Sequence, residues 1–420
     1  MMKNLKTVVA STSALLILFA GVCLADTFIN HQTNETLHGY ITSRLPGSAQ
    51  SARQDNSSQK AAETEDGPTS VFTQEKGLLK LIPKEWEIER DNLGRNNKVI
   101  VVPVDDAIMY EIETDAFEKA IAESSQEGPL FILVEIDTPG GRVDLAQRMC
   151  TAIIDADCNV IAFVKGGKYG GAISAGAAVS LSCNKIYMTE NTIIGAATLV
   201  TSPKDKEQNK DKKYEDVVNE KYSSAWRAYL ASLAQQNNRP SLLARAMVNG
   251  ENSIEVVEVN QGGKRLFIEP INKMPGQQVA RTWNKSGSLL TLTAREAVDC
   301  TIADGLVGSR EQLLQQLQAG DANVVTDKKV ANARKDLLLA QRKMNEALKD
   351  FDLKVEQSKY KQPAQKFMSM LREAKTDVET IKTLAKKYPD LHMDTESVEK
   401  ELTSINAAYE NALRETKRRN

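Results

Sequence analysis

Residues 130–141 of the 420-residue chain read LFILVEIDTPGG, and they give the clearest indication of the fold of its central part. The nearly continuous apolar run at 130–136 predicts a strand that is covered on both faces, as in a parallel sheet. Pro139 fixes its own backbone φ and Gly140-Gly141 allow positive φ, so we expect the chain to turn sharply directly after the strand. Because the N–H groups of such a turn are not shielded by side chains, they can bind an oxyanion.

Further strands and helices alternate on both sides of this stretch. Short β-branched or apolar runs predict strands, and segments with helical spacing predict helices at 113–124 and 143–154; the strands are expected at 98–104, 159–164 and 185–188. This order predicts an α/β fold with a mainly parallel sheet. Residues 253–292 differ, because two β-rich runs flank Asn260-Gln261-Gly262-Gly263 and predict a hairpin.

The two ends of the chain have other compositions. Lys3 and Lys6 precede an apolar run that ends at Ala25, which predicts a signal peptide at 1–25; an uncleaved membrane anchor is the alternative. Residues 26–78 are polar and without a sustained period, which favours a disordered linker. Residues 79–320 form the predicted α/β domain. Residues 321–420 hold 21 Lys/Arg, 17 Asp/Glu and no Gly, and Pro363 and Pro389 divide them into about three helices, so we expect a helical hairpin or coiled-coil extension.

Charge, cysteines and histidines exclude several classes of function. The 54 basic and 56 acidic residues balance, which argues against a nucleic-acid partner. The five cysteines include no zinc-binding spacing, and we expect neither a metal nor a cofactor. In an oxidising compartment Cys150, Cys158, Cys183 and Cys300 could pair, although single buried thiols fit equally well. The three histidines (His31, His38 and His392) lie near the ends, so chemistry in the middle has to proceed without imidazole.

Ser174 lies in the small-residue stretch GGAISAGAA (170–178) and opens a predicted helix. A serine at this position is commonly an N-cap. The functional interpretation makes Ser174 a nucleophile, whose developing negative charge lies near the N–H groups of the helix N-terminus. Both interpretations fit the sequence.

A serine nucleophile needs a base, and without histidine a lysine with a lowered pKa can serve if it is buried. In the helix predicted at 216–236, Lys221 aligns with an apolar stripe; the stripe consists of Tyr222, Ala225, Trp226, Tyr229, Leu230, Leu233 and Ala234. A lysine that extends from the edge of this stripe into solvent fits equally well. Lys165 and Lys168 are weaker candidates, and the lysines of the charged run 203–213 are expected to lie on a solvated flap.

Together these segments resemble the Clp-protease/crotonase superfamily, and within it the NfeD-type and signal-peptide-peptidase-A-type serine proteases. The resemblance runs from about residue 98 to 317; it is carried by EIDTPGGRVDLA (135–146), GGAISAGAAVSLSCNKIYM (170–188), IGAATLV (194–200), AYLASLAQQNNRPSLLARAMV (228–248) and LTLTAREAVDCTIADGLVG (290–308). It implies a spiral of ββα units and ATP-independent hydrolysis of peptides by a Ser-Lys dyad. By motif position, Ser174 and Lys221 form this dyad, and Gly140, Gly141 and Ala175 form the oxyanion hole.

The function expected from the sequence is therefore an exported serine endopeptidase that cleaves extended, apolar peptide segments. It would be periplasmic or extracytoplasmic, it would form a homo-oligomer, and a membrane protein could be its substrate or partner. The alternative is a catalytically inactive scaffold of the same fold that acts through residues 321–420. A crotonase-like acyl-CoA enzyme is a weaker alternative, because export would separate it from CoA.

Overall fold

The computed structural model describes residues 26–41, 69–73, 76–82, 84–89, 98–199, 212–248 and 254–419. The predicted signal peptide at 1–25 and most of the predicted flap at 203–213 lie outside these residues. The chain divides into two compact units: Met1–Ile108 with Ala120–Asp327, and Met109–Lys119 with Lys328–Asn420.

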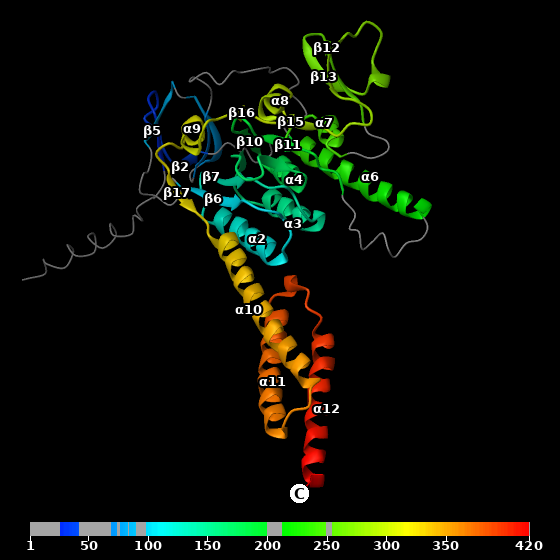
Figure 1. Cartoon of the computed structure of the whole chain (residues 1–420). Helices are drawn as coiled ribbons and strands as arrows, with labels where there is room; N and C mark the ends of the chain where they lie inside the picture. Colours follow the sequence, from blue (N-terminus) through cyan, green and yellow to red (C-terminus); the bar gives the residue numbers. More distant parts are fainter. Residues whose placement is uncertain are drawn as a thin grey trace, which may run out of the picture. The chain divides into compact units, whose positions relative to one another are not determined.

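A six-stranded, wholly parallel sheet forms the centre of the first unit, in the order β16-β10-β8-β7-β6-β17. Its strands are β6 (Lys98–Val104), β7 (Phe131–Ile136), β8 (Val160–Val164), β10 (Lys185–Met188), β16 (Gly305–Leu306) and β17 (Asn323–Thr326). Every residue of β7 and β8 is buried, as the apolar runs predicted. The α/β class with a mainly parallel sheet is confirmed (Figure 1).

Helix α2 (Glu111–Gln126) follows β6 and α3 (Val143–Ile154) follows β7, whereas α4 (Ala175–Ser182) follows the short strand β9 (Gly171–Ile173). Helix α3 has the predicted bounds and buries its apolar side; its buried residues are Leu145, Ala146, Met149, Cys150 and Ile153. All eight residues of α4 are buried, which its small side chains permit. Further along the chain lie α6 (Lys212–Gln236), α7 (Ser241–Ala246), α8 (Ala294–Asp299) and α9 (Arg310–Gln316).

The first unit also contains two small sheets of three strands each. Strands β9 (Gly171–Ile173), β11 (Ile193–Gly195) and β15 (Thr291–Thr293) pair in the order β15-β11-β9. Strands β12 (Val256–Gln261) and β13 (Lys264–Ile268) form the predicted hairpin, and β14 (Val279–Asn284) pairs with the other edge of β12.

The prediction of a disordered linker at 26–78 is wrong for the described residues of this range. They form β1 (Asp26–Asn30), β2 (Thr36–Ile41), β3 (Thr69–Thr73) and β4 (Gly77–Leu81), which join β5 (Trp86–Glu89) in a five-stranded antiparallel sheet. Its buried core is made by one large apolar residue from each of four strands, and further apolar residues pack against them; the core residues are Phe28, Leu37, Val71 and Leu81, and those packed against them are Leu79, Trp86 and Ile88. Such widely spaced apolar residues give no continuous pattern in the sequence.

The second unit contains three long helices, α10 (Lys329–Ser358), α11 (Ala364–Lys387) and α12 (Thr395–Arg419), with the short 3-10 helix η2 (Pro389–Leu391) before α12. Pro363 is the N-cap residue of α11 and Pro389 begins η2, as expected of residues that interrupt helices. The three helices lie side by side and share one core, which includes Phe351, Ala374 and Ile405 (Figure 1). The helical C-terminal region predicted from the sequence is confirmed from Lys329 on. The expectation that it begins at residue 321 is wrong, because residues 323–326 form β17 and pair with β6 in the parallel sheet of the first unit.

Residues 109–119 belong to the same unit as these helices. The carboxylate of Asp390 accepts hydrogen bonds from the N–H groups of Glu111 (2.8 Å) and Ile112 (3.0 Å) at the start of α2. Arg334 forms an ion pair with Glu113. A capping carboxylate thus comes from a position almost 280 residues away in the sequence, which local sequence patterns do not reveal.

Candidate active site

Ser174 lies between β9 and α4 with an unusual backbone conformation. Its φ is 55° and its ψ is −117°, a combination that costs a residue other than glycine about 1–3 kcal/mol. Hydrogen bonds hold the chain there: the N–H of Ser174 donates to Gly195 O (2.8 Å), and the N–H of Ile173 donates to Thr138 O (3.1 Å). Strained turns between a strand and a helix are known to present nucleophilic serines.

The side chain of Ser174 does not act as a helix cap. It is the N-cap residue of α4 by position, but it makes no side-chain cap hydrogen bond. The side chain is partly exposed. Of the two interpretations that the sequence left open, the capping one is therefore wrong.

Gly140 is packed directly against Ser174. Its φ is 98°, and a Cβ atom at this position would lie 2.5 Å from Ser174 Cβ, 2.9 Å from Ser174 Oγ and 3.0 Å from Ala175 N. A Cβ atom at Gly141 would lie 2.0 Å from the carbonyl oxygen of Ile108. The predicted proximity of the Gly140-Gly141 turn to Ser174 is thus present, and both glycines are required by close contacts.

The three predicted oxyanion donors differ in their hydrogen bonds. The N–H of Gly140 already donates to Thr138 Oγ1 (3.1 Å). The N–H groups of Gly141 and Ala175 have no acceptor within the described part of the chain. These two N–H groups, together with Ser174 Oγ, are the groups here that remain available to a bound carbonyl.

Asp137 and Thr138 belong to the motif quoted from the sequence, but no role was predicted for either residue. Thr138 is fully buried and its hydroxyl donates to Asp106 O (2.7 Å). Asp137 is 4% exposed, and its carboxylate accepts from the N–H groups of Tyr169 (3.1 Å) and Gly171 (3.2 Å). The C-terminal end of a parallel strand is a common place for functional residues, and this position was the signal available in the sequence.

Lys221 lies on α6 and its side chain is exposed. The expectation that Lys221 aligns with the buried face of this helix is wrong. Trp226 is 4% exposed, and its indole N–H donates to Ala197 O (2.9 Å); Leu230, Leu233 and Ala234 are buried as well. Lys221 precedes Trp226 by five residues, which at 3.6 residues per turn places the two side chains roughly 140° apart around the helix. Tyr222, 62% exposed, also lies outside the buried face.

Lys165, one of the two lysines shortly before Ser174 in the sequence, is held in its charged form. Its ammonium lies 2.9 Å from the Asp105 carboxylate and 3.3 Å from that of Glu135. Burial disfavours the charge, but the hydrogen bond and charge of Asp105, with those of Glu135, hold the pKa of Lys165 above its ordinary value. A general base has to be neutral, so Lys165 is poorly suited to that role.

Four cysteines (Cys150, Cys158, Cys183 and Cys300) are buried free thiols. Burial raises the pKa of Cys150 to about 12 and that of Cys300 to about 12. The alternative of disulfide pairing is not observed. A thiol that keeps its proton in this way is a poor nucleophile.

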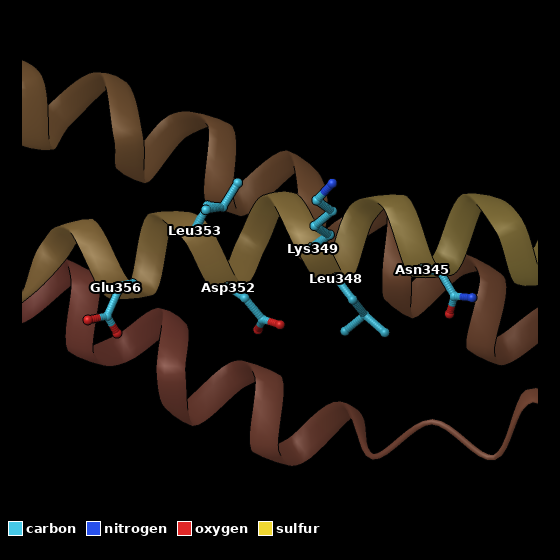
Figure 2. A pocket seen from close by; sticks show the side chains of 6 residues that line it. All are labelled: Asn345, Leu348, Lys349, Asp352, Leu353 and Glu356. Atoms are coloured by element: carbon cyan, nitrogen blue, oxygen red, sulfur yellow. The ribbon is translucent and has the colours of Figure 1, made fainter.

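Among the described residues, no group of three or more His, Cys, Asp or Glu side chains could hold a metal ion. A groove of about 610 Å³ lies in the second unit on one side of α10; Asn345, Leu348, Lys349, Asp352, Leu353 and Glu356 line it (Figure 2). None of the predicted site residues is among them. No helix in the described ranges is both long and apolar enough to span a bilayer.

Comparison with known proteins points to one family. Residues 98–272 match the family model described as NfeD1b, N-terminal domain. The chain is 26% identical over 219 residues to Membrane protein NfeD1b of Bacillus subtilis (strain 168). This aligned region covers 52% of this chain and 41% of that protein. It is 27% identical over 171 residues to Membrane-bound protease PH1510 of Pyrococcus horikoshii, which covers 38% of this chain and 35% of that protein. The chain thus spans less than half the length of these relatives.

Among solved structures, the chain is similar to a serine-to-alanine mutant of the 1510-N membrane-bound stomatin-specific protease. The TM-score is 0.38 at 20% identity, and the match covers 55% of this chain and 97% of that one. The sequence match extends over most of the parallel sheet and includes Ser174 and the Gly140-Gly141 turn. Residues 98–272 thus match the NfeD1b N-terminal domain, and the resemblance to NfeD-type proteins inferred from the sequence is confirmed.

Proposed function

We propose that this protein is a serine endopeptidase with Ser174 as its nucleophile. The observation that carries the proposal is the conformation of Ser174: positive φ, a hydroxyl that caps no helix, and Gly140 in direct contact. Ser174 Oγ would attack the carbonyl carbon of a peptide bond, and the carbonyl oxygen would become the oxyanion. The N–H groups of Gly141 and Ala175 would donate to it, while Gly140 leaves the space that the tetrahedral intermediate needs.

Lys221 is the proposed base. As the bond from Oγ to carbon forms, the neutral amine would take the hydroxyl proton, and it would then give that proton to the leaving amine nitrogen. Water would hydrolyse the acyl-enzyme in a second, analogous cycle. The family resemblance and the charged state of Lys165 support this assignment. It requires the Lys221 side chain, exposed in the free protein, to approach Ser174 when substrate is bound.

The proposed substrate is an extended, apolar peptide segment. The name of one relative, a membrane-bound protease, supports protein substrates at or near a membrane. An exported protein, delivered by the predicted signal peptide at 1–25, would meet such substrates outside the cytoplasm. A homo-oligomer remains part of the proposal.

One observation favours a second candidate function. The exposed position of Lys221 fits a catalytically inactive relative, in which the α/β domain is a scaffold and the three-helix unit binds partners. The two candidates differ in one property, because only the peptidase depends on the hydroxyl of Ser174.

The test is cleavage of an unfolded protein and of apolar peptides from pH 7 to 10 by the wild type, Ser174→Ala and Lys221→Ala. The peptidase proposal predicts cleavage that is lost in Ser174→Ala and that rises toward alkaline pH, where a lysine base becomes neutral. Unchanged cleavage by Lys221→Ala would remove that residue from the proposed mechanism. Absence of cleavage by well-folded wild type would favour the scaffold.

A further inference from the structure

Asp137 is a buried carboxylate at the point where two loops of the candidate site meet. It follows β7 directly, and its N–H donates to Val104 O (3.0 Å) on the neighbouring strand. Its own main chain leads into the Thr138–Gly141 turn. Its side chain contacts a different segment, residues 167–171, which leads into β9 and Ser174.

The carboxylate accepts hydrogen bonds from two backbone N–H groups of that segment. Both oxygens lie near Tyr169 N, at 3.3 Å and 3.1 Å, and Oδ1 also accepts from Gly171 N at 3.2 Å. The backbone at Gly167 passes close by, because a Cβ atom there would lie 2.5 Å from Oδ2. One buried carboxylate therefore holds the segment at two points, Tyr169 N and Gly171 N.

The backbone next to Asp137 continues the same connection. The N–H of Thr138 donates to Gly171 O (2.8 Å), and the N–H of Ile173 donates to Thr138 O (3.1 Å). Residues 137 and 138 therefore hold β9 through both side chain and backbone, up to the residue before Ser174. The hydroxyl of Tyr169 also donates to Asp106 Oδ1, so the segment is held at a further point.

We infer that Asp137 is a positioning residue for Ser174, an inference that rests on the proposed peptidase function. The carboxylate holds the segment that leads into the nucleophile, while the adjoining turn carries Gly141. One residue therefore sets how far Ser174 Oγ lies from an oxyanion donor. A displacement of about 1 Å at a reacting atom can slow a reaction about 100-fold, so the reaction rate should depend strongly on Asp137.

Glu135 offers a matched control two residues earlier. It is buried as well, at 2% exposure, but its carboxylate pairs with the side chains of Lys165 and Arg310. These partners lie outside the segment at 167–171. Glu135→Gln therefore removes a buried carboxylate from β7, two residues before Asp137, and leaves the hydrogen bonds before Ser174 in place.

The test measures acylation of the full chain by an apolar β-lactone. In this reaction Ser174 Oγ bonds to the lactone carbonyl carbon, the ring C–O bond breaks, and the ring oxygen takes the proton, so the protein gains the whole mass of the reagent. The wild type, Asp137→Asn and Glu135→Gln are compared by intact mass, together with kcat and KM on a cleaved peptide and thermal unfolding.

We expect acylation and kcat to fall about 100-fold in Asp137→Asn with KM changed less than about two-fold, since binding surfaces away from the nucleophile are kept. Glu135→Gln should react at close to the wild-type rate even if it unfolds at a similarly lowered temperature. If Asp137→Asn does not fold, Asp137→Glu keeps the charge one methylene further out and should also react slowly.

Two outcomes distinguish the inference from the function on which it rests. Wild-type acylation at Ser174 combined with equal rates in the Asp137 and Glu135 variants would overturn the positioning role alone. Absence of acylation in the folded wild type would overturn the proposed function, and the positioning role with it.

Discussion

Replacing Gly140 by alanine introduces one methyl group at the closest contact of the candidate site. That Cβ atom would lie 2.5 Å from Ser174 Cβ and 2.9 Å from Ser174 Oγ. Ordinary contacts of a Cβ atom begin at 3.4 Å. The added methyl group and the Ser174 side chain would therefore have to separate by almost 1 Å.

The expected cost has two parts. A side chain at the positive φ of 98° strains the backbone by about 1–3 kcal/mol. The overlap with Ser174 adds about 1–3 kcal/mol, as is typical of an overpacked site. The displacement of almost 1 Å at the nucleophile should lower the rate of acylation about 100-fold.

Gly170→Ala is the matched control. Gly170 also has a positive φ, 77°, but a Cβ atom there meets nothing within 4 Å. The Gly170→Ala variant therefore has the backbone strain but no overlap with Ser174, although residue 170 lies only four residues before Ser174. Acylation by the β-lactone and thermal unfolding of the wild type and both variants separate the two effects. An acylation rate in Gly140→Ala equal to that of Gly170→Ala would refute the proposed contact between Gly140 and the nucleophile.

Three other perturbations have equally specific expected results. Thr138→Val removes the hydroxyl that binds Gly140 N and Asp106 O, and should lower the free energy of unfolding by about 1–3 kcal/mol. Thr138→Ser keeps the hydroxyl and should retain most of the stability in thermal unfolding. Equal losses in the two variants would contradict this role of the hydroxyl. The buried thiols of Cys150 and Cys300 keep their protons up to a pKa of about 12, while unfolded thiols release theirs above about 9. Above pH 9 the native state therefore binds more protons than the unfolded state, and the free energy of unfolding should fall by about 1.4 kcal/mol per pH unit for each thiol. The fall should be less steep in Cys150→Ala. A urea midpoint that does not change between pH 8 and 10 would contradict this prediction. Asp390→Ala removes the cap of α2 and should lower the free energy of unfolding by about 1–2 kcal/mol, measured by thermal unfolding. Asp394→Ala, which removes an exposed cap of α12, is the control. A stability of Asp390→Ala equal to that of the wild type would exclude this capping role.

Four strands of the parallel sheet, β6, β7, β8 and β10, could be predicted because they are short, continuous and apolar. The edge strands β16 and β17 were not predicted, because they are too short or too exposed to give an apolar run. Residues 98–104, 143–154 and 185–188 have the predicted structure and bounds, since buried runs with clear turns between them leave few alternatives. The antiparallel sheet at the N-terminus could not be predicted in this way. Strand β1, with the sequence DTFIN, has Phe28 as its one large residue in the core, and only pairing with distant strands gives it a buried face.

The candidate site was predictable in part. The residues themselves predicted a sharp turn at Gly140-Gly141 and a helix opened by Ser174, and the family resemblance implied that the two lie together; Gly140 does lie against Ser174. The N–H of Gly140 donates a hydrogen bond to the side chain of Thr138. Sequence spacing does not reveal such a contact. The face of α6 was misjudged because Tyr222 and Trp226 look equivalent in the sequence, whereas only Trp226 finds a buried acceptor, Ala197 O.

Whether Ser174 is the nucleophile is tested most directly by mapping where an apolar β-lactone attaches to the folded full chain. We expect one adduct per chain, on the peptide that contains Ser174, and none in Ser174→Ala. The same result is expected when Lys165 is replaced by glutamine, because that lysine is not the proposed base. An adduct on another residue, or none on well-folded wild type, would contradict the claim that Ser174 is the nucleophile.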